Sequence, residues 1–348
     1  MRQMNEFPKT IMNIEELEEL ISRPSDNLIN LMKELEGDFI FLGIAGKMGP
    51  SMAEMAIRAS KNAGVKRKFY GVSRFSKPED QKKLEKIGVI TIKGDLLNET
   101  FLETLPKVKN VIFLAGMKFG AENNLSLTWA MNTYLPALVA KHFSESRIVA
   151  LSTGTVYPLV PVKSGGSLEN DKSGAMGEYA QSCLGRERMF EYGSHTNNTP
   201  VALIRLNYSV EMRYGVIVDI ATKVKNNVTI DLSMGYFNAI WQSDANNMIL
   251  LSLNHVASPA EIINITGEDI ISVRYVAEKI GKLMNKDVRF TGKEEDTALL
   301  NNASKAFKIF GKPEIEVDQI IESTADWILK GKELLGKPTK FEVRNGKY

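Results

Sequence analysis

Residues 38–58 read DFIFLGIAGKMGPSMAEMAIR, and this stretch decides which fold the chain adopts. A short apolar run at 39–42 ends in a glycine turn, and a helix-like segment follows at once. The glycines of the turn are Gly43, Gly46 and Gly49. A strand, a glycine turn and a helix in this order are what a dinucleotide-binding loop needs. The stretch therefore predicts a phosphate-binding loop, with an ordinary glycine-rich connection as the alternative.

Each glycine of this turn would serve a different physical purpose. Gly43 allows a tight turn, Gly46 lets the backbone approach a diphosphate, and Gly49 lets the new helix pack closely. The free N–H groups at the helix start then face the phosphates. Lys47 and Met48 lie between the second and third glycines, so we expect them to line the same cofactor site.

The composition excludes several classes of protein. The 348 residues carry 44 basic and 42 acidic side chains, and this net charge of +2 gives no electrostatic basis for nucleic-acid binding. The single cysteine excludes an internal disulfide and fits a reducing compartment, and three scattered histidines offer no zinc-ligand spacing. There is no run of ~18 apolar residues and no signal peptide. We expect a cytoplasmic protein with no metal and no membrane segment.

Apolar strands alternate with helical segments along the first two thirds of the chain. Strands are expected at 38–43, 67–72, 88–92, 110–115, 147–152 and 201–206. Helices are expected between them at 50–63, 78–87, 98–105, 124–143 and 178–193. This alternation predicts an α/β fold with a doubly wound, Rossmann-type parallel sheet. The ligand of such a sheet binds at the carboxyl ends of its strands.

Three parts of the chain differ in pattern. Residues 1–36 are expected to form a helical extension, and 37–207 the dinucleotide-binding domain. Residues 208–348 are expected to form a smaller mixed lobe, mainly for substrate, and a tail. Its strands are expected at 228–231, 237–241, 261–265 and 287–290, and its helices at 216–226, 243–254, 271–284, 302–309 and 316–330.

Further motifs follow the strands of the predicted sheet. They are Ser73-Arg74, Gly94-Asp95-Leu96, Ala115-Gly116-Met117-Lys118, the run from Ser152 to Tyr157, Tyr179-Ala180-Gln181-Ser182, Arg205-Leu206-Asn207 and Asp244-Ala245, together with Asn132 in the long helix. With the GxxGxxG spacing of the glycines, they resemble the extended branch of the short-chain dehydrogenase/reductase superfamily. That branch includes nucleotide-sugar epimerases and dehydratases. The resemblance covers roughly residues 38 to 330.

The resemblance implies roles for particular residues. Tyr179 is expected to be the acid/base, and Thr153 to hydrogen-bond the reacting oxygen. Cofactor contacts are implied for Gly43, Gly46, Lys47, Met48, Gly49, Ser73, Arg74, Asp95, Leu96, Ala115, Gly116, Met117, Lys118 and Asn132. Candidate substrate contacts are Thr155, Arg205, Asn207, Tyr208 and Trp241, with core packing as the alternative for those at strand ends.

The chain departs from the family at position 183. The family pattern is Tyr-x-x-x-Lys, whereas Tyr179 is followed four residues later by Cys183. A phenol has a pKa of about 10 and needs a nearby positive charge to act as a base near neutral pH. Two repairs are open, because Lys118 or the nicotinamide ring could supply that charge. The other readings are a loss of hydride chemistry and a nucleophilic role for Cys183.

Cofactor choice depends on the end of the second strand. NAD-binding members of the family tend to carry an acid there, whereas this chain has Ser73 and Arg74, which suit a 2′-phosphate. We therefore favour NADP over NAD.

Asn132 and Tyr179 lie on the two helices that often pair across a dimer in this family, so we expect a homodimer.

Two functional hypotheses remain at this point. The first is an NAD(P)-dependent oxidoreductase or epimerase/dehydratase-type enzyme acting on a sugar-like or polyol substrate. The second is a dinucleotide-binding protein that has lost hydride transfer and acts as a sensor or partner subunit.

The segment 164–167, Ser-Gly-Gly-Ser, is either a mobile flap over the pocket or a plain connector.

Overall fold

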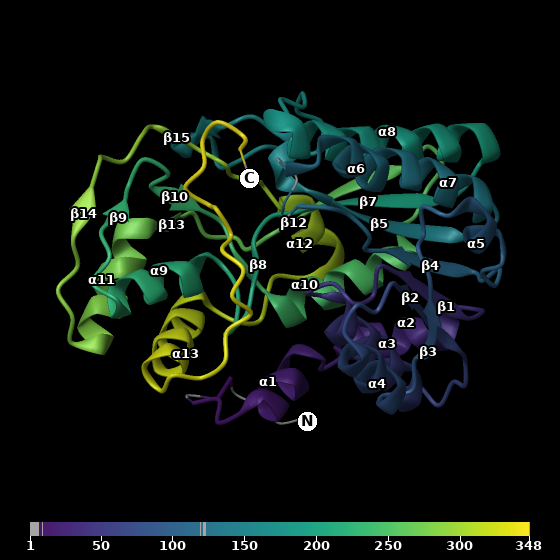
Figure 1. The fold of residues 1–348 in the computed structure, drawn as a ribbon, viewed down its shortest axis with the longest axis horizontal. Helices are drawn as coiled ribbons and strands as arrows, with labels where there is room; N and C mark the ends of the chain where they lie inside the picture. The colour runs from purple at the N-terminus through teal and green to yellow at the C-terminus, as the bar shows by residue number, and fades with distance from the viewer. Residues whose placement is uncertain (1–6, 9, 119, 121–122, 348) are drawn as a thin grey trace.

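The computed structural model describes residues 7, 8, 10–118, 120 and 123–347. A parallel seven-stranded sheet forms its centre, with the strand order β12-β7-β5-β4-β1-β2-β3 (Figure 1). The strands are β1 (Phe39–Leu42), β2 (Phe69–Ser73), β3 (Ile90–Lys93), β4 (Asn110–Phe113), β5 (Arg147–Thr153), β7 (Val201–Leu206) and β12 (Glu261–Ile265). This arrangement confirms the predicted α/β Rossmann-type sheet.

Helices cover both faces of this sheet, because successive side chains of a strand point to opposite faces. In β1, Phe39 and Phe41 belong to one hydrophobic cluster, and Ile40 and Leu42 belong to another. The first cluster includes residues of α2 (Asp26–Glu34), α3 (Gly49–Asn62), α4 (Pro78–Lys86), α10 (Gln242–Leu251) and α12 (Ser304–Phe310). The second includes residues of α5 (Glu99–Glu103), α7 (Leu135–His142) and α8 (Gly177–Asn197).

The long helix expected at 124–143 is interrupted. It consists of α6 (Leu125–Trp129), a π-helical turn, η2 (Ala130–Tyr134), and α7. Inserted π turns are frequent at functional sites. Asn132 lies inside this turn and is fully buried.

The second lobe has its own hydrophobic core. Its helices are α9 (Val216–Lys225), α11 (Val273–Met284) and α13 (Val317–Leu329), and α1 (Ile14–Ile21) contributes to the same core. Short strands pair around it: β8 (Ser209–Val210) with β11 (Ile240–Trp241), β9 (Ile230–Asp231) with β14 (Phe290–Thr291), and β10 (Tyr236–Phe237) with β13 (Ile271–Ser272). A fourth pair, β6 (Val160–Pro161) with β15 (Thr297–Ala298), joins this lobe to the segment after β5.

The sequence misplaced one strand. Residues 261–265 were assigned to the smaller lobe, but β12 pairs in parallel with β7 in the central sheet. The expected strand at 237–241 is also two strands, β10 and β11, with different partners. Residues 331–347 then return from α13 across the second lobe (Figure 1, yellow). Among the described residues, no helix is both long enough and apolar enough to span a membrane.

Candidate functional site

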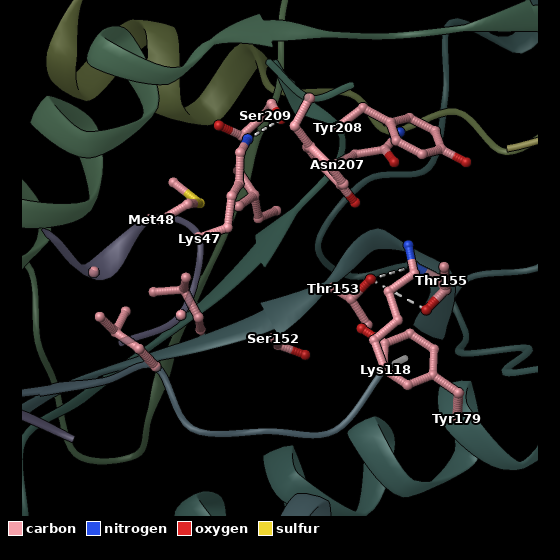
Figure 2. Close-up of a pocket in the computed structure, with 16 residues that line it drawn as sticks. Lys47, Met48, Lys118, Ser152, Thr153, Thr155, Tyr179, Asn207, Tyr208 and Ser209 are labelled. Carbon is pink, nitrogen blue, oxygen red and sulfur yellow. Dashed lines mark hydrogen bonds between the residues drawn. The ribbon is translucent and has the colours of Figure 1, made fainter. Parts of the chain in front are cut away.

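A cavity of about 240 Å³ lies at the carboxyl ends of β1, β4, β5 and β7. The glycine loop, the turn after β4, the end of β5, the start of α8 and the segment after β7 all line it. Figure 2 shows two polar groups in this cavity. Lys47 and Ser209 lie on one side, and Lys118, Thr153, Thr155 and Tyr179 lie together on the other.

The glycine loop has the close contacts that a phosphate-binding loop needs. Gly43 has a φ of +89°, and a Cβ there would lie 2.7 Å from the backbone of Ala115. A Cβ on Gly49 would lie 2.0 Å from the carbonyl oxygen of Ile44. Helix α3 begins at Gly49, and Met48 at its N-cap makes no side-chain hydrogen bond to the helix. The N-terminal N–H groups of α3 are therefore not capped by that side chain, which fits an anionic ligand.

Lys47 crosses from the loop to the second lobe. Its ammonium donates a hydrogen bond of 2.7 Å to the carbonyl oxygen of Ser209 and lies 4.6 Å from the centroid of the Tyr214 ring. Burial lowers the pKa of Lys47 to about 7, although the charge of Glu211 opposes that change. An anion bound beside Lys47 would stabilise the protonated ammonium and so raise its pKa.

Tyr179 and Thr153 line the cavity together (Figure 2). The Tyr179 ring packs against the small apolar cluster that contains Cys183. Thr153 in turn accepts a hydrogen bond of 3.2 Å from the backbone N–H of Thr155 and lies 3.1 Å from its hydroxyl. Burial raises the pKa of Tyr179 well above its ordinary value, so the phenol holds its proton at neutral pH. The structure thus brings together the two residues that the sequence paired.

Cys183 lies behind Tyr179 and is inaccessible to solvent. Burial raises the pKa of its thiol, and the charge of Arg186 opposes the rise. A buried thiol that keeps its proton is a poor nucleophile, so this geometry does not support a nucleophilic role for Cys183.

Arg186 is a feature that the sequence analysis missed. It donates a hydrogen bond of 2.6 Å to the carbonyl of Leu151 and another of 2.9 Å to Oδ1 of Asn132. Its charge lowers the pKa values of both Tyr179 and Cys183. The signal was present in the helical spacing, because positions 179, 183 and 186 share one helical face.

Lys118 lines the same cavity from the turn after β4. Its ammonium donates a hydrogen bond of 3.2 Å to the carbonyl of Thr339. Burial lowers the pKa of Lys118 to about 8, and the charge of Asp219 opposes that change. The lysine therefore keeps most of its positive charge at neutral pH.

Asn132 holds the turn that carries Lys118. Its Oδ1 accepts a hydrogen bond of 2.8 Å from the N–H of Met117, and its Nδ2 donates one of 2.9 Å to the carbonyl of the same residue. Nδ2 also lies 3.0 Å from the hydroxyl of Ser182. Asn132 thus ties the π turn and α8 to the turn at 115–118. Ala115 is buried, Met117 is half-buried, and Gly116 is exposed but too close to Arg186 to accept a Cβ.

The candidate substrate contacts divide into two groups. Thr155, Asn207 and Tyr208 line the cavity. Arg205 is instead buried in an ion pair of 2.8 Å with Glu187. Trp241 is buried in the core of the second lobe. Sequence alone could not separate these groups, because a strand end next to the ligand edge also adjoins the core.

The remaining cofactor candidates lie outside the cavity, at the ends of β2 and β3. Ser73 is half-buried and Arg74 is exposed, and neither position carries a carboxylate. Asp95 is exposed and accepts a hydrogen bond of 3.0 Å from the N–H of Leu97, and Leu96 beside it is buried.

Three other findings complete the site. Ser209 and Tyr214 line the cavity without any sequence motif to mark them. The segment 164–167 is fastened by a hydrogen bond of 2.9 Å from the N–H of Ser167 to the carbonyl of Leu300, which favours a connector over a mobile flap. Within the described ranges, no cluster of three or more His, Cys, Asp or Glu side chains could hold a metal ion.

The fold is similar to that of solved nucleotide-sugar enzymes. A dTDP-glucose 4,6-dehydratase from Bacillus anthracis, solved with NAD, is 18% identical, has a TM-score of 0.71 and aligns over 84% of this chain and 96% of its own. A UDP-glucuronic acid 4-epimerase from Bacillus cereus, solved with UDP-glucuronic acid and NAD, is 14% identical, with a TM-score of 0.69 over 84% and 99%. The enzyme WbmG from Bordetella bronchiseptica, solved with NAD and UDP, is 17% identical, with a TM-score of 0.68 over 88% and 99%. No protein-family model and no curated protein sequence matches the chain. At these identities the likeness establishes the fold alone.

Proposed function

We propose that the protein is an NAD(P)-dependent enzyme of the epimerase/dehydratase or oxidoreductase type, with Tyr179 as its acid/base. The observation that carries the proposal is that Tyr179 and Thr153 line the same cavity as the glycine loop. This cavity brings the acid/base candidate close to the cofactor candidates at the sheet edge where ligands of this fold bind.

The residues present fit a dinucleotide. Gly43 and Gly49 let the loop pack tightly against Ala115 and Ile44, where a Cβ would clash, and α3 begins with N–H groups that its N-cap side chain leaves unbonded. Lys47 adds a positive charge beside them. A nicotinamide dinucleotide bound there would supply or accept a hydride at the substrate carbon.

The protein's own residues would handle the proton. Tyr179 keeps its proton at neutral pH and would donate it to a substrate carbonyl oxygen as that oxygen gains negative charge. Thr153 would hold the same oxygen by a second hydrogen bond. In the reverse direction Tyr179 must lose its proton before it can accept one, and the charge of Arg186 favours that loss, although burial keeps the pKa of Tyr179 raised. Arg186 would thus supply part of the positive charge that Cys183 cannot supply, with Lys118 lining the same cavity.

We favour NADP as the cofactor and a carbohydrate-like substrate. Arg74 is exposed at the end of β2 with no carboxylate to repel a 2′-phosphate. The structural neighbours were solved with NAD; two are a dTDP-glucose 4,6-dehydratase and a UDP-glucuronic acid 4-epimerase, and the third was solved with UDP as well. That likeness supports a sugar or polyol as substrate by analogy of fold.

Cofactor binding is the first test. NADPH and NADH are titrated against the purified protein, with tryptophan fluorescence and thermal shift as readouts. We expect both to bind, NADPH more tightly, and Arg74→Ala to weaken NADPH about tenfold while NADH binds as before. Binding of neither cofactor would overturn the proposal. Binding without any turnover across a panel of sugars and polyols would leave a dinucleotide-binding sensor or partner subunit as the function.

A further inference from the structure

The end of the chain returns to the cavity. We define residues 337–347 as the C-terminal strap. It follows α13 through a stretch with no regular helix or strand and passes across the second lobe toward the start of α8 (Figure 1). The sequence analysis treated this stretch as a tail.

Thr339 is the point at which the strap meets Lys118. Both the N–H and the hydroxyl of Thr339 donate to Oδ2 of Asp219 on α9, at 2.8 Å and 2.6 Å. Its carbonyl accepts the hydrogen bond from Lys118, and its side chain is buried. Helix α9, the strap and the turn after β4 are therefore linked through one residue.

The strap is anchored on both sides of Thr339. Phe341 is buried in the core of the second lobe, with its ring 6.3 Å from that of Phe237. Arg344 donates to the carbonyl and the hydroxyl of Thr297, at 2.8 Å and 2.6 Å. These contacts fix the strap along its length, because the Phe341 ring is removed from water and Arg344 provides hydrogen bonds to polar groups of Thr297.

The end of the strap meets the helix that carries Tyr179. A Cβ on Gly346 would lie 2.2 Å from the carbonyl oxygen of Met176, and a Cβ on Gly177 would lie 2.2 Å from the carbonyl oxygen of Gly346. Backbone packs against backbone here with no room for a side chain. Gly177 is the first residue of α8 and lies two positions before Tyr179.

We propose that the C-terminal strap is a working part of the active site, in which Thr339 positions the Lys118 ammonium and Gly346 fixes the start of α8. The inference rests on the proposed function, because it gives Lys118 a purpose as the cation of a site whose usual lysine is replaced by Cys183. The strap closes one side of Lys118 and supplies its carbonyl acceptor. Thr339 and Gly346 are positioning residues, since they act through Lys118 and Tyr179.

The burial of Lys118 gives the proposal a readout. The strap helps to keep solvent from Lys118, and burial lowers its pKa from 10.5 to about 8. The charged and titratable groups near Lys118 include Cys183 and Tyr179 on α8, Asp219 on α9, Lys340 on the strap and Lys47 in the glycine loop. Displacing the strap would restore water and remove the Lys340 charge, and both changes raise the pKa of Lys118.

The test compares two glycines of the C-terminal region. Gly346→Ala forces the strap off Met176, whereas Gly336→Ala serves as a matched control, because Gly336 also has a positive φ and a Cβ there would meet nothing within 4 Å. Thr339→Val is a second variant, which removes the hydroxyl bond to Asp219 and the bond that this hydroxyl accepts from the N–H of Phe341. The full-length protein is labelled with ¹³C at the lysine ε-carbons, and the Lys118 signal is identified by its loss in Lys118→Arg.

We expect Lys118 to titrate near pH 8 in the wild-type protein and in Gly336→Ala. We expect its midpoint to rise by about 1 pH unit or more in Gly346→Ala and Thr339→Val, with faster tryptic cleavage at Lys340 and Arg344. An unchanged Lys118 midpoint in both variants, with the strap cleaved faster, would overturn the proposal. These readouts need neither cofactor nor substrate, so failure of the strap and failure of the proposed function are separate results.

Discussion

The ammonium of Lys47 donates a 2.7 Å hydrogen bond to the carbonyl of Ser209, which lies 162 positions further along the chain. The loop expected to hold a diphosphate is thereby joined to the second lobe. Because burial lowers the pKa of Lys47 to about 7, this residue changes charge within the physiological range.

We predict that dinucleotide affinity falls as pH rises through 7. Only protonated Lys47 attracts a diphosphate, and a bound diphosphate raises the pKa of Lys47, so binding takes up a proton above pH 7. The dissociation constant should increase about tenfold between pH 7 and pH 8.5, as fluorescence titration can measure. Lys47→Met should bind more weakly at pH 6 and lose this dependence. Equal pH slopes for the two proteins would contradict the assignment.

Removing the acid/base should abolish turnover but leave cofactor binding intact. Tyr179→Phe keeps the ring and removes the proton that we assign to the reaction. We expect kcat to fall by about 10² to 10⁴, with the NADPH dissociation constant changed less than about threefold. Thr153→Val should give a smaller loss, because Thr153 positions the oxygen and transfers no proton. Steady-state kinetics with a substrate found by screening measures both effects, and near-normal turnover in Tyr179→Phe would refute the role.

A lysine placed at position 183 should destabilise this protein. Cys183 is inaccessible to solvent, and Arg186 already places a positive charge near it. A second buried cation without a partner should cost about 3 kcal/mol or more in the free energy of unfolding. Cys183→Ser is the control, which keeps the volume and adds no charge. Urea unfolding measures the stability of both variants. A Cys183→Lys variant that is as stable as Cys183→Ser would mean that Arg186 does not supply the positive charge at this position.

Arg205 should matter for stability rather than for substrate affinity. It is buried in an ion pair with Glu187, whose carboxylate also accepts a 2.5 Å hydrogen bond from Ser152. Glu187→Gln leaves the Arg205 charge unneutralised and should lower the free energy of unfolding by about 3–5 kcal/mol. Thr155→Val, a change at the cavity, is the comparison and should alter KM more than stability. A raised KM with unchanged stability in Glu187→Gln would return Arg205 to the substrate site.

The homodimer remains a prediction, with a surface that can be tested. Trp129 and Tyr134, on the interrupted helix, and Tyr192 on α8 are 37%, 48% and 68% exposed. Light scattering coupled to gel filtration should give twice the chain mass of 38.8 kDa. Tyr192→Glu should shift the mass toward that of one chain, because a charge at an apolar interface is costly. A monomeric wild-type protein at micromolar concentration would exclude the dimer.

The positions of the central-sheet strands up to β7 along the chain could be predicted because each apolar run is followed by a turn and a helix. The glycine loop, Thr153 and Tyr179 were predictable for a related reason, since each occurs in a short motif at a strand or helix end. Position 183 was also readable as a departure from that motif. These features depend on neighbours in the sequence.

The features that sequence missed depend on contacts between distant segments. Nothing near Arg186 reveals that it reaches Asn132, and nothing near Thr339 reveals that it meets Lys118. Residues 261–265 read as a strand, but only the shape of the sheet decides that β12 pairs with β7. The burial of Arg205 follows from the position of Glu187 on another element, which no local pattern encodes.

The crossing of β12 from the second lobe into the central sheet has a consequence for how the molecule could be divided. A fragment ending at residue 207 would leave the edge of β7 without its hydrogen-bonding partner. It would also lose α10 and α12 from the cluster that covers one face of the sheet. Such a fragment would expose an unpaired, aggregation-prone strand edge beside an uncovered apolar surface. The two lobes are therefore parts of one folding unit, and neither could be exchanged between proteins as a module.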